Sequence, residues 1–117
     1  MTLAEIVFQK KKLEKKYGVE GKVAGFYVEA GYDVRMGFNT SKGRLSFIAK
    51  KGGQLLAVDV VAASKVLGRD AVEAIAEKAK AIKAKPVLVL YGAGPKLSDE
   101  AKTAARELGV KIRRVRP

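Results

Sequence analysis

The sequence contains no cysteine and no histidine among its 117 residues. Without cysteine the chain has no disulfide bond and no thiolate metal site. Without histidine it has no imidazole that could bind a metal or act as a general base near neutral pH. A Ser/His/Asp or Cys/His catalytic set is therefore excluded.

Long apolar runs are also missing. No stretch approaches the roughly 20 consecutive apolar residues that a membrane-spanning helix needs. The first apolar residues are interrupted by Glu5 and followed by three consecutive lysines from Lys10, so the beginning of the sequence does not resemble a signal peptide. These features predict a cytoplasmic protein with no membrane partner.

Acidic residues are scarce relative to basic ones. Lys and Arg number 24 and Asp and Glu number 12, which gives a formal net charge of +12 at pH 7. Such an excess favours a polyanionic partner, and nucleic acid is the commonest one. The alternative is the lysine-rich surface of a heat-adapted protein, but that surface usually carries matching glutamate, which this sequence lacks. The candidates for phosphate contact are Lys10, Lys11, Lys12, Lys15, Lys16, Arg35, Lys42, Arg44, Arg113, Arg114 and Arg116.

Apolar periodicity and turn residues predict one α/β domain over residues 1–117. Thr2 and Glu5 form a capping-box pattern that begins a first helix, and Gly18 ends it. Further helices are predicted over 20–30, 70–83 and 99–108, strands over 32–36, 44–50, 54–61, 86–91 and 110–115, and a polar loop over 37–43. The order is ααβββαβαβ. A strand meander followed by helical crossovers predicts a mixed five-stranded sheet with helices on both faces.

The most informative stretch is 44–62. Two apolar runs flank Gly52 and Gly53, which predicts a β-hairpin. The second run, 54–61, is almost wholly apolar, and this places it near the middle of the sheet. Asp59 interrupts the run, and a buried carboxylate costs on the order of several kcal/mol unless it is paired, hydrogen-bonded or bound to a metal. Asp59 is therefore either a remnant of catalytic chemistry or one partner of a structural ion pair.

Four positions around this hairpin resemble the active site of the PD-(D/E)xK nuclease superfamily, above all that of archaeal Holliday-junction resolvases. In those enzymes a helix carries a glutamate, a Pro-Asp pair begins the second strand, and the third strand carries an acid followed two residues later by a lysine. Here Glu20 falls at the helix position and Ser46 at the aspartate position. Asp59 falls at the acid, and Val61 stands where the lysine belongs. Because strand residues two apart point the same way, an acid and a lysine so placed share one face. The resemblance implies a restriction-endonuclease-like α/β fold.

In that superfamily the carboxylates bind Mg²⁺ beside the scissile phosphate, and the lysine orients or activates water. Ser46 and Val61 replace one metal ligand and the lysine, so the resemblance implies a catalytically degenerate site that holds no metal or other cofactor. Mg²⁺ would be used only if Lys65 or Asp33 supplied the missing groups. Both remaining acids also have structural interpretations, namely an ion pair for the acid in the strand and a favourable place near the helix dipole for the acid in the helix.

A second segment resembles the catalytic domain of archaeal tRNA-splicing endonucleases. Residues 31–38, GYDVRMGF, are similar to the Gly-Tyr-x-Val-(Lys/Arg)-x-Gly-Phe segment of that domain. Those enzymes cut RNA with a Tyr/His/Lys set and no metal, and a chain without histidine cannot supply this set. Some archaeal versions pair a catalytic subunit with a structural subunit, a role that suits a short basic chain.

The sequence therefore predicts a catalytically degenerate nuclease-fold protein that binds structured RNA or branched DNA as the non-catalytic subunit of a heteromeric nuclease. The most specific version is the structural subunit of an archaeal tRNA-splicing endonuclease, beside a catalytic partner chain. The alternative is a homodimeric DNA-binding protein that resembles Holliday-junction resolvases. A third possibility is an active Mg²⁺-dependent nuclease that uses Glu20, Asp59 and a relocated lysine.

Overall fold

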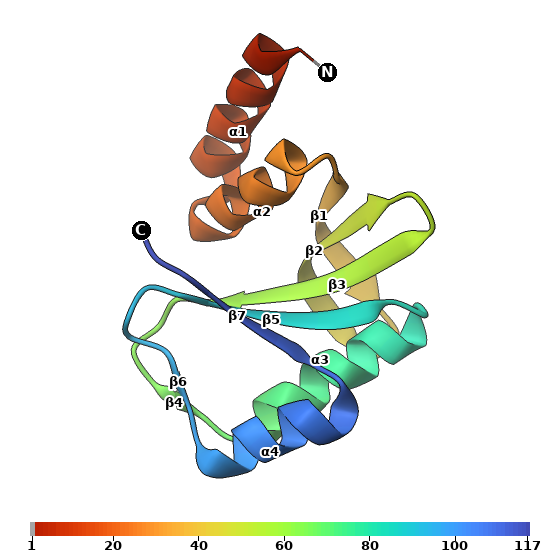
Figure 1. The fold of residues 1–117 in the computed structure, drawn as a ribbon, viewed down its shortest axis with the longest axis vertical. Coiled ribbons are helices and arrows are strands. Elements are labelled where there is room, and N and C mark those ends of the chain that lie inside the picture. The colour runs from red at the N-terminus through yellow and green to blue at the C-terminus, as the bar shows by residue number, and fades with distance from the viewer. Residues whose placement is uncertain (1) are drawn as a thin grey trace.

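The computed structural model describes residues 2–117 as four helices and seven strands (Figure 1). The helices are α1 (Leu3–Tyr17), α2 (Val19–Glu29), α3 (Arg69–Ala81) and α4 (Asp99–Leu108). The strands are β1 (Asp33–Thr40), β2 (Gly43–Lys51), β3 (Gln54–Val61), β4 (Val66–Leu67), β5 (Lys85–Tyr91), β6 (Lys96–Leu97) and β7 (Lys111–Val115). Five strands form one sheet, with α2 packed on one face and α3 and α4 on the other, while α1 lies outside α2.

The main sheet has the strand order β1-β2-β3-β5-β7. The first three strands are antiparallel neighbours, and β3, β5 and β7 are parallel, since helix α3 lies between β3 and β5 in the chain and helix α4 lies between β5 and β7. This confirms the predicted mixed sheet with helices on both faces. The sequence did not predict β4 and β6, two short strands that pair with each other in a separate parallel ribbon.

The polar loop predicted over 37–43 is wrong. Strand β1 continues to Thr40, and a tight turn at 41–42 leads directly into β2. Gly37 has φ +61°, a left-handed conformation that glycine adopts without steric cost. Pairing resumes beyond it, with Phe38 opposite Leu45. The glycine therefore bends the strand where the sequence indicated its end.

The sheet separates two apolar cores. The α2-side core contains Val23 of α2 together with Phe47, Val58 and Val89 of the strands. The α3-side core is built by α3, α4 and the other face of the sheet, and its members include Leu45, Ile75, Leu88, Leu90 and Ala101. Membership of one core or the other shows which face of the sheet each strand side chain occupies.

Helix α1 is attached to the fold through α2. It begins with the predicted capping box, in which the Thr2 hydroxyl accepts from the Glu5 amide and the Glu5 carboxylate accepts from Thr2. Gly21 allows close contact between the two helices, since a Cβ at this position would stand 2.0 Å from the carbonyl oxygen of Leu13. No residue of α1 is buried.

Within residues 2–117, none of the helices has both the length and the apolar character needed to cross a membrane.

Candidate functional site

The main sheet forks between β2 and β3. Backbone pairing of these strands ends at Phe47 and Val58, although β2 reaches back to Gly43 and β3 continues to Val61. Beyond that point β2 remains paired with β1, and β3 remains paired with β5. The fork leaves backbone groups of both strands without their ladder partners, so side chains must satisfy them.

Ser46 occupies the point of the fork. Leu45 packs in the α3-side core and Phe47 in the α2-side core, although residues two apart on a regular strand face the same way. The alternation of side chains between the two faces therefore breaks at Ser46, which lies across from the bend at Gly37. These two residues do not pair in the register of β1 with β2. Ser46 is only 4% exposed and is the one buried polar side chain among the described residues.

Hydrogen bonds from Ser46 connect three of the four residues predicted from the sequence. Its backbone N–H donates to Oδ1 of Asp59 at 3.1 Å, and its Oγ accepts from the backbone N–H of Val60 at 3.0 Å. The same Oγ donates to Oε2 of Glu20 at 2.8 Å. The Asp59 and Ser46 side chains thus replace the missing ladder bonds, and Glu20 is tied to both strands through Ser46.

Two cations complete this network. Nζ of Lys78, on α3, lies 2.5 Å from Oδ2 of Asp59 and donates to the carbonyl oxygen of Arg44 at 2.9 Å. The Arg44 guanidinium lies 3.3 Å from Oε1 of Glu20. Each of the four carboxylate oxygens therefore accepts a hydrogen bond, and two positive charges balance two negative ones. We call Glu20, Arg44, Ser46, Asp59 and Lys78 the fork network.

Helix α2 holds Glu20 in place at the fork. Glu20 lies in the first turn, where its charge suits the helix dipole. Val23 and Ala24 anchor the helix in the α2-side core. Lys22 meets Tyr91 at the end of β5, and the hydrogen bond with the tyrosine hydroxyl raises the pKa of Lys22 above its usual value.

The fork network does not fit a magnesium centre. Mg²⁺ takes oxygen ligands in near-octahedral geometry. Only Glu20 and Asp59 contribute carboxylates, and all their oxygens already bond to Ser46, Lys78 or Arg44. No group of three or more acidic side chains that could hold a metal ion occurs within residues 2–117.

The structure places the remaining predicted site residues as follows. Val61 lies on the same side of β3 as Asp59 and packs against the α3-side core. Its apolar side chain provides no positive charge beside Asp59. Asp33 is exposed at the start of β1, opposite Lys50, and takes part in none of the hydrogen bonds and ion pairs of the fork network. Lys65 is exposed in the segment after β3, and the lysine that reaches Asp59 is Lys78 instead.

Sequence reasoning missed Lys78. This residue lies three positions after Ile75 and one before Ala79, both of which are buried against the sheet. A charged residue next to the apolar stripe of an amphipathic helix indicates an oppositely charged partner on the sheet beneath the helix. The partner itself was not visible, because the sequence does not specify how α3 lies across β3.

The candidates for phosphate contact do not form one patch. Lys10 pairs with Glu29, Arg44 belongs to the fork network, and Arg114 donates to the carbonyl oxygens of Gly92 and Pro95. The other candidates are exposed: Lys11, Lys12, Lys15, Lys16, Arg35, Lys42, Arg113 and Arg116.

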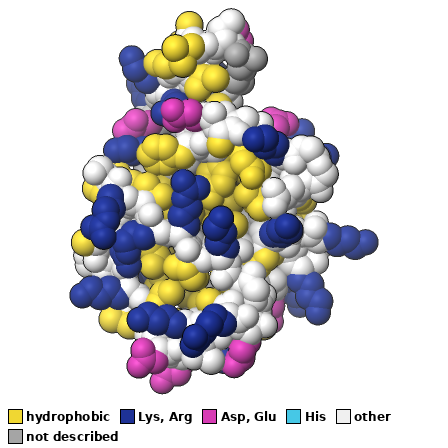
Figure 2. All heavy atoms as spheres, viewed as in Figure 1, with side chains coloured by type: hydrophobic (Ala, Val, Ile, Leu, Met, Phe, Trp, Pro, Cys, Tyr) yellow, Lys and Arg dark blue, Asp and Glu magenta, His cyan; other side chains and the backbone are white. Residues whose placement is uncertain are grey.

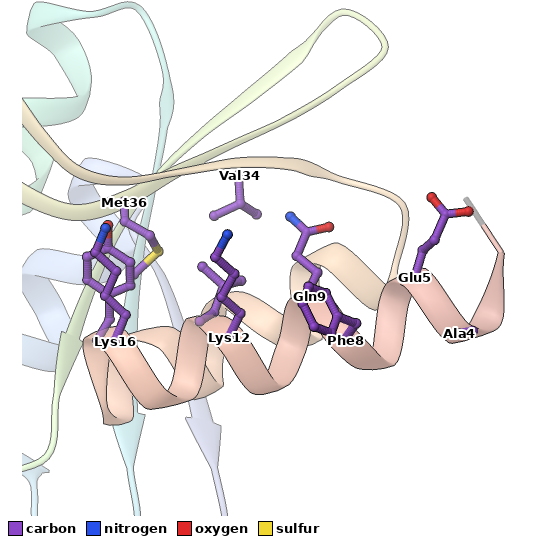
Figure 3. Close-up of a pocket in the computed structure, with 10 residues that line it drawn as sticks. Ala4, Glu5, Phe8, Gln9, Lys12, Lys16, Val34 and Met36 are labelled. Carbon is purple, nitrogen blue, oxygen red and sulfur yellow. The ribbon is translucent and has the colours of Figure 1, made fainter.

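Two of these exposed lysines lie beside an apolar hollow. Lys12 and Lys16 point from α1 toward Val34 and Met36 of β1, and Phe8 lies on the same pocket of about 710 Å³ (Figure 3). Lys42 lies elsewhere, in a hollow with Glu77 and Lys80 of α3.

The mixed five-stranded sheet with helices on both faces is that of the restriction-endonuclease-like fold. Solved structures share it. A crystal structure of a protein of unknown function has a TM-score of 0.68 and 16% identity, over 82% of this chain and 56% of its own. A repair endonuclease from Pyrococcus abyssi has a TM-score of 0.61 and 18% identity, over 79% of this chain and 42% of the endonuclease. EndoMS in complex with double-stranded DNA has a TM-score of 0.54 and 16% identity, over 72% of this chain and 37% of EndoMS.

These similarities confirm the predicted fold class and concern the fold alone. The matched part covers between 37% and 56% of those three chains, so this chain corresponds to about half of each or less. No family model and no curated protein matches the sequence.

Proposed function

We propose that this protein binds structured nucleic acid without cutting it, as a nuclease-fold subunit whose catalytic centre has become a structural ion-pair network. The fork network is the observation that supports the proposal most directly. Its two carboxylates face Lys78 and Arg44, and a serine stands where the resemblance to the PD-(D/E)xK nucleases places the third acid. A metal ion would have to displace both cations before it met these oxygens.

Charge supports the binding half of the proposal. The net charge is +12, and Figure 2 shows one face whose middle carries Lys and Arg side chains, with acidic side chains toward its two ends. Such a surface attracts a phosphate backbone and releases condensed counterions on binding. The repair endonuclease and the DNA-bound EndoMS among the structural neighbours make DNA the first ligand to test.

Two specific versions follow from the sequence. As the structural subunit of an archaeal tRNA-splicing endonuclease, the chain would associate with a histidine-containing catalytic chain and bind precursor tRNA. As a protein that resembles Holliday-junction resolvases, it would form a homodimer and prefer four-way DNA junctions. Fluorescence anisotropy with a labelled four-way junction and a labelled precursor tRNA, together with the molar mass in solution, distinguishes the two versions.

The binding itself is tested by its dependence on salt. The affinity for the labelled four-way junction is measured in EDTA between 50 and 200 mM KCl, and a loss of about 10³-fold is expected if about six phosphates are contacted. A variant with Lys11, Lys12, Lys15 and Lys16 changed to Gln should show a shallower slope. A variant with Lys50, Lys65, Lys80 and Lys102 changed to Gln carries the same loss of charge at other exposed positions and serves as the control. An affinity that does not change with salt would exclude the proposal.

A further inference from the structure

Helix α2 spans only part of the α2-side face of the sheet. Helix α2 has 11 residues and is therefore about 16 Å long. It covers the end of the face that carries Val58 and Val89, both fully buried. At the other end, Leu56 and Val87, which are 8% and 2% exposed, lie at the floor of a groove of about 570 Å³ that opens between α2 and β7. We call it the β7 groove.

The strand register brings three cations to this groove. Lys85 lies opposite Leu56, Lys111 opposite Val87, and Arg113 opposite Val89. Residues two apart on a strand share a face, so Lys111 and Arg113 lie on the same face as Val115, which belongs to the α2-side core. A strand that sends two basic side chains toward the layer that α2 occupies indicates that this part of the face meets solvent or a ligand.

The charge of the groove is uncompensated. Lys85, Lys111 and Arg113 take part in none of the ion pairs formed within residues 2–117, and no acidic side chain lines the groove. In Figure 1, β7 crosses in front of β5, and Figure 2 shows basic side chains around apolar ones on this same side. An anionic ligand would therefore stabilise the groove.

The wall of the groove is aromatic. Phe26 and Tyr27 come from α2, and Tyr32 stands just before β1. The rings of Tyr27 and Tyr32 meet edge to face with centroids 5.5 Å apart, and the Arg113 guanidinium lies over the Tyr27 ring at 5.4 Å. Aromatic rings beside cations are the usual means by which proteins bind single-stranded nucleic acid, because bases stack on rings and phosphates meet the charges.

We propose that the β7 groove binds an unpaired nucleotide of a single strand, with its phosphate at Lys111 and Arg113 and its base against Phe26 and Tyr32. The volume lies within the range of about 300–1,000 Å³ that is typical of small-ligand sites, and a duplex does not fit it. This inference rests on the proposed function and extends it. The groove is a second site, because Asp59 and Lys78 of the fork network lie on the opposite face of the sheet.

The test uses single-stranded and junction DNA side by side. Anisotropy of labelled dT12 is measured for the wild type, for Lys111→Gln with Arg113→Gln, and for Tyr32→Leu. The control changes Lys65 and Lys102 to Gln, which removes the same charge from exposed positions outside the groove. We expect the dissociation constant for dT12 to rise at least tenfold in the double groove variant, at least threefold in Tyr32→Leu, and less than threefold in the control. The affinity for the four-way junction should change less than threefold in all variants.

A second readout reports on the groove directly. The protein has no tryptophan and four tyrosines, of which Tyr27 and Tyr32 line the groove. Tetrathymidylate should therefore quench tyrosine fluorescence in the wild type, and oligoglutamate of equal charge should not. Junction binding without dT12 binding, or equal quenching by oligoglutamate, would overturn the inference and leave the proposed function intact. Failure to bind either DNA would overturn both.

Discussion

Replacing Lys78 by methionine should destabilise the protein markedly, because it leaves the Asp59 carboxylate without its cation in a mostly closed site. The side chains of Lys78 and Asp59 are only 13% and 20% exposed. Breaking a fully buried ion pair costs about 3–5 kcal/mol, whereas an exposed pair contributes about 0.2–1 kcal/mol. At the observed exposures we expect Lys78→Met to lower the free energy of unfolding by about 2–3 kcal/mol, slightly less than the loss of a fully buried pair.

Urea denaturation followed by circular dichroism measures this loss, and the melting temperature should fall by about 8–12 °C. Lys80→Met is the matched control, since Lys80 lies two residues further along α3 and is exposed. Adding Asp59→Asn to Lys78→Met should recover part of the lost stability, because the neutral amide can still accept from the Ser46 N–H. The reasoning is refuted if Lys78→Met and Lys80→Met are equally stable, or if the two changes at the fork are simply additive.

Two further changes test the surroundings of the fork. Ser46→Ala should cost about 1–3 kcal/mol, because the part-buried Val60 N–H loses its acceptor. Ser41→Ala in the exposed turn is its control in the same urea titration, and equal stabilities would contradict the expectation. Gly21→Ala should cost about 1–3 kcal/mol through the clash with the Leu13 carbonyl. Gly18→Ala is its control, since a Cβ at Gly18 has no atom within 4 Å and the change tests the backbone conformation alone. If Gly21→Ala does not lower the stability, the contact between α1 and α2 adjusts without cost and the expectation is contradicted.

Local signals explain why most of the fold was predictable. The capping box at Thr2, the Ser98 cap and the left-handed Gly109 depend on residues within one helical turn, and each helix end lies close to its predicted position. The almost wholly apolar run of β3 likewise indicated a central strand, and it pairs on both sides. The predicted end of β1 at residue 36 is too early, because a glycine at positive φ inside a strand has the same sequence signature as a turn.

The candidate site was predictable only in part. The positions of Glu20, Ser46 and Asp59 followed from a spacing pattern, and the structure brings all three together. Lys78 joins them from α3, and this depends on how the helix lies across the sheet, which no local pattern encodes. The β7 groove could not be predicted for the same reason, since only the register of β5 with β3 and β7 brings Lys85 and Lys111 to one groove.

Cleavage of the labelled four-way junction in Mg²⁺ or Mn²⁺ tests the central claim most directly. The protein is incubated with the junction at concentrations where anisotropy shows it to be bound, and the DNA is then analysed on a denaturing gel. The fork network, with Asp59 paired to Lys78 and Glu20 to Arg44, predicts that the bound DNA stays intact. Metal-dependent cutting that disappears in Asp59→Ala would contradict the account.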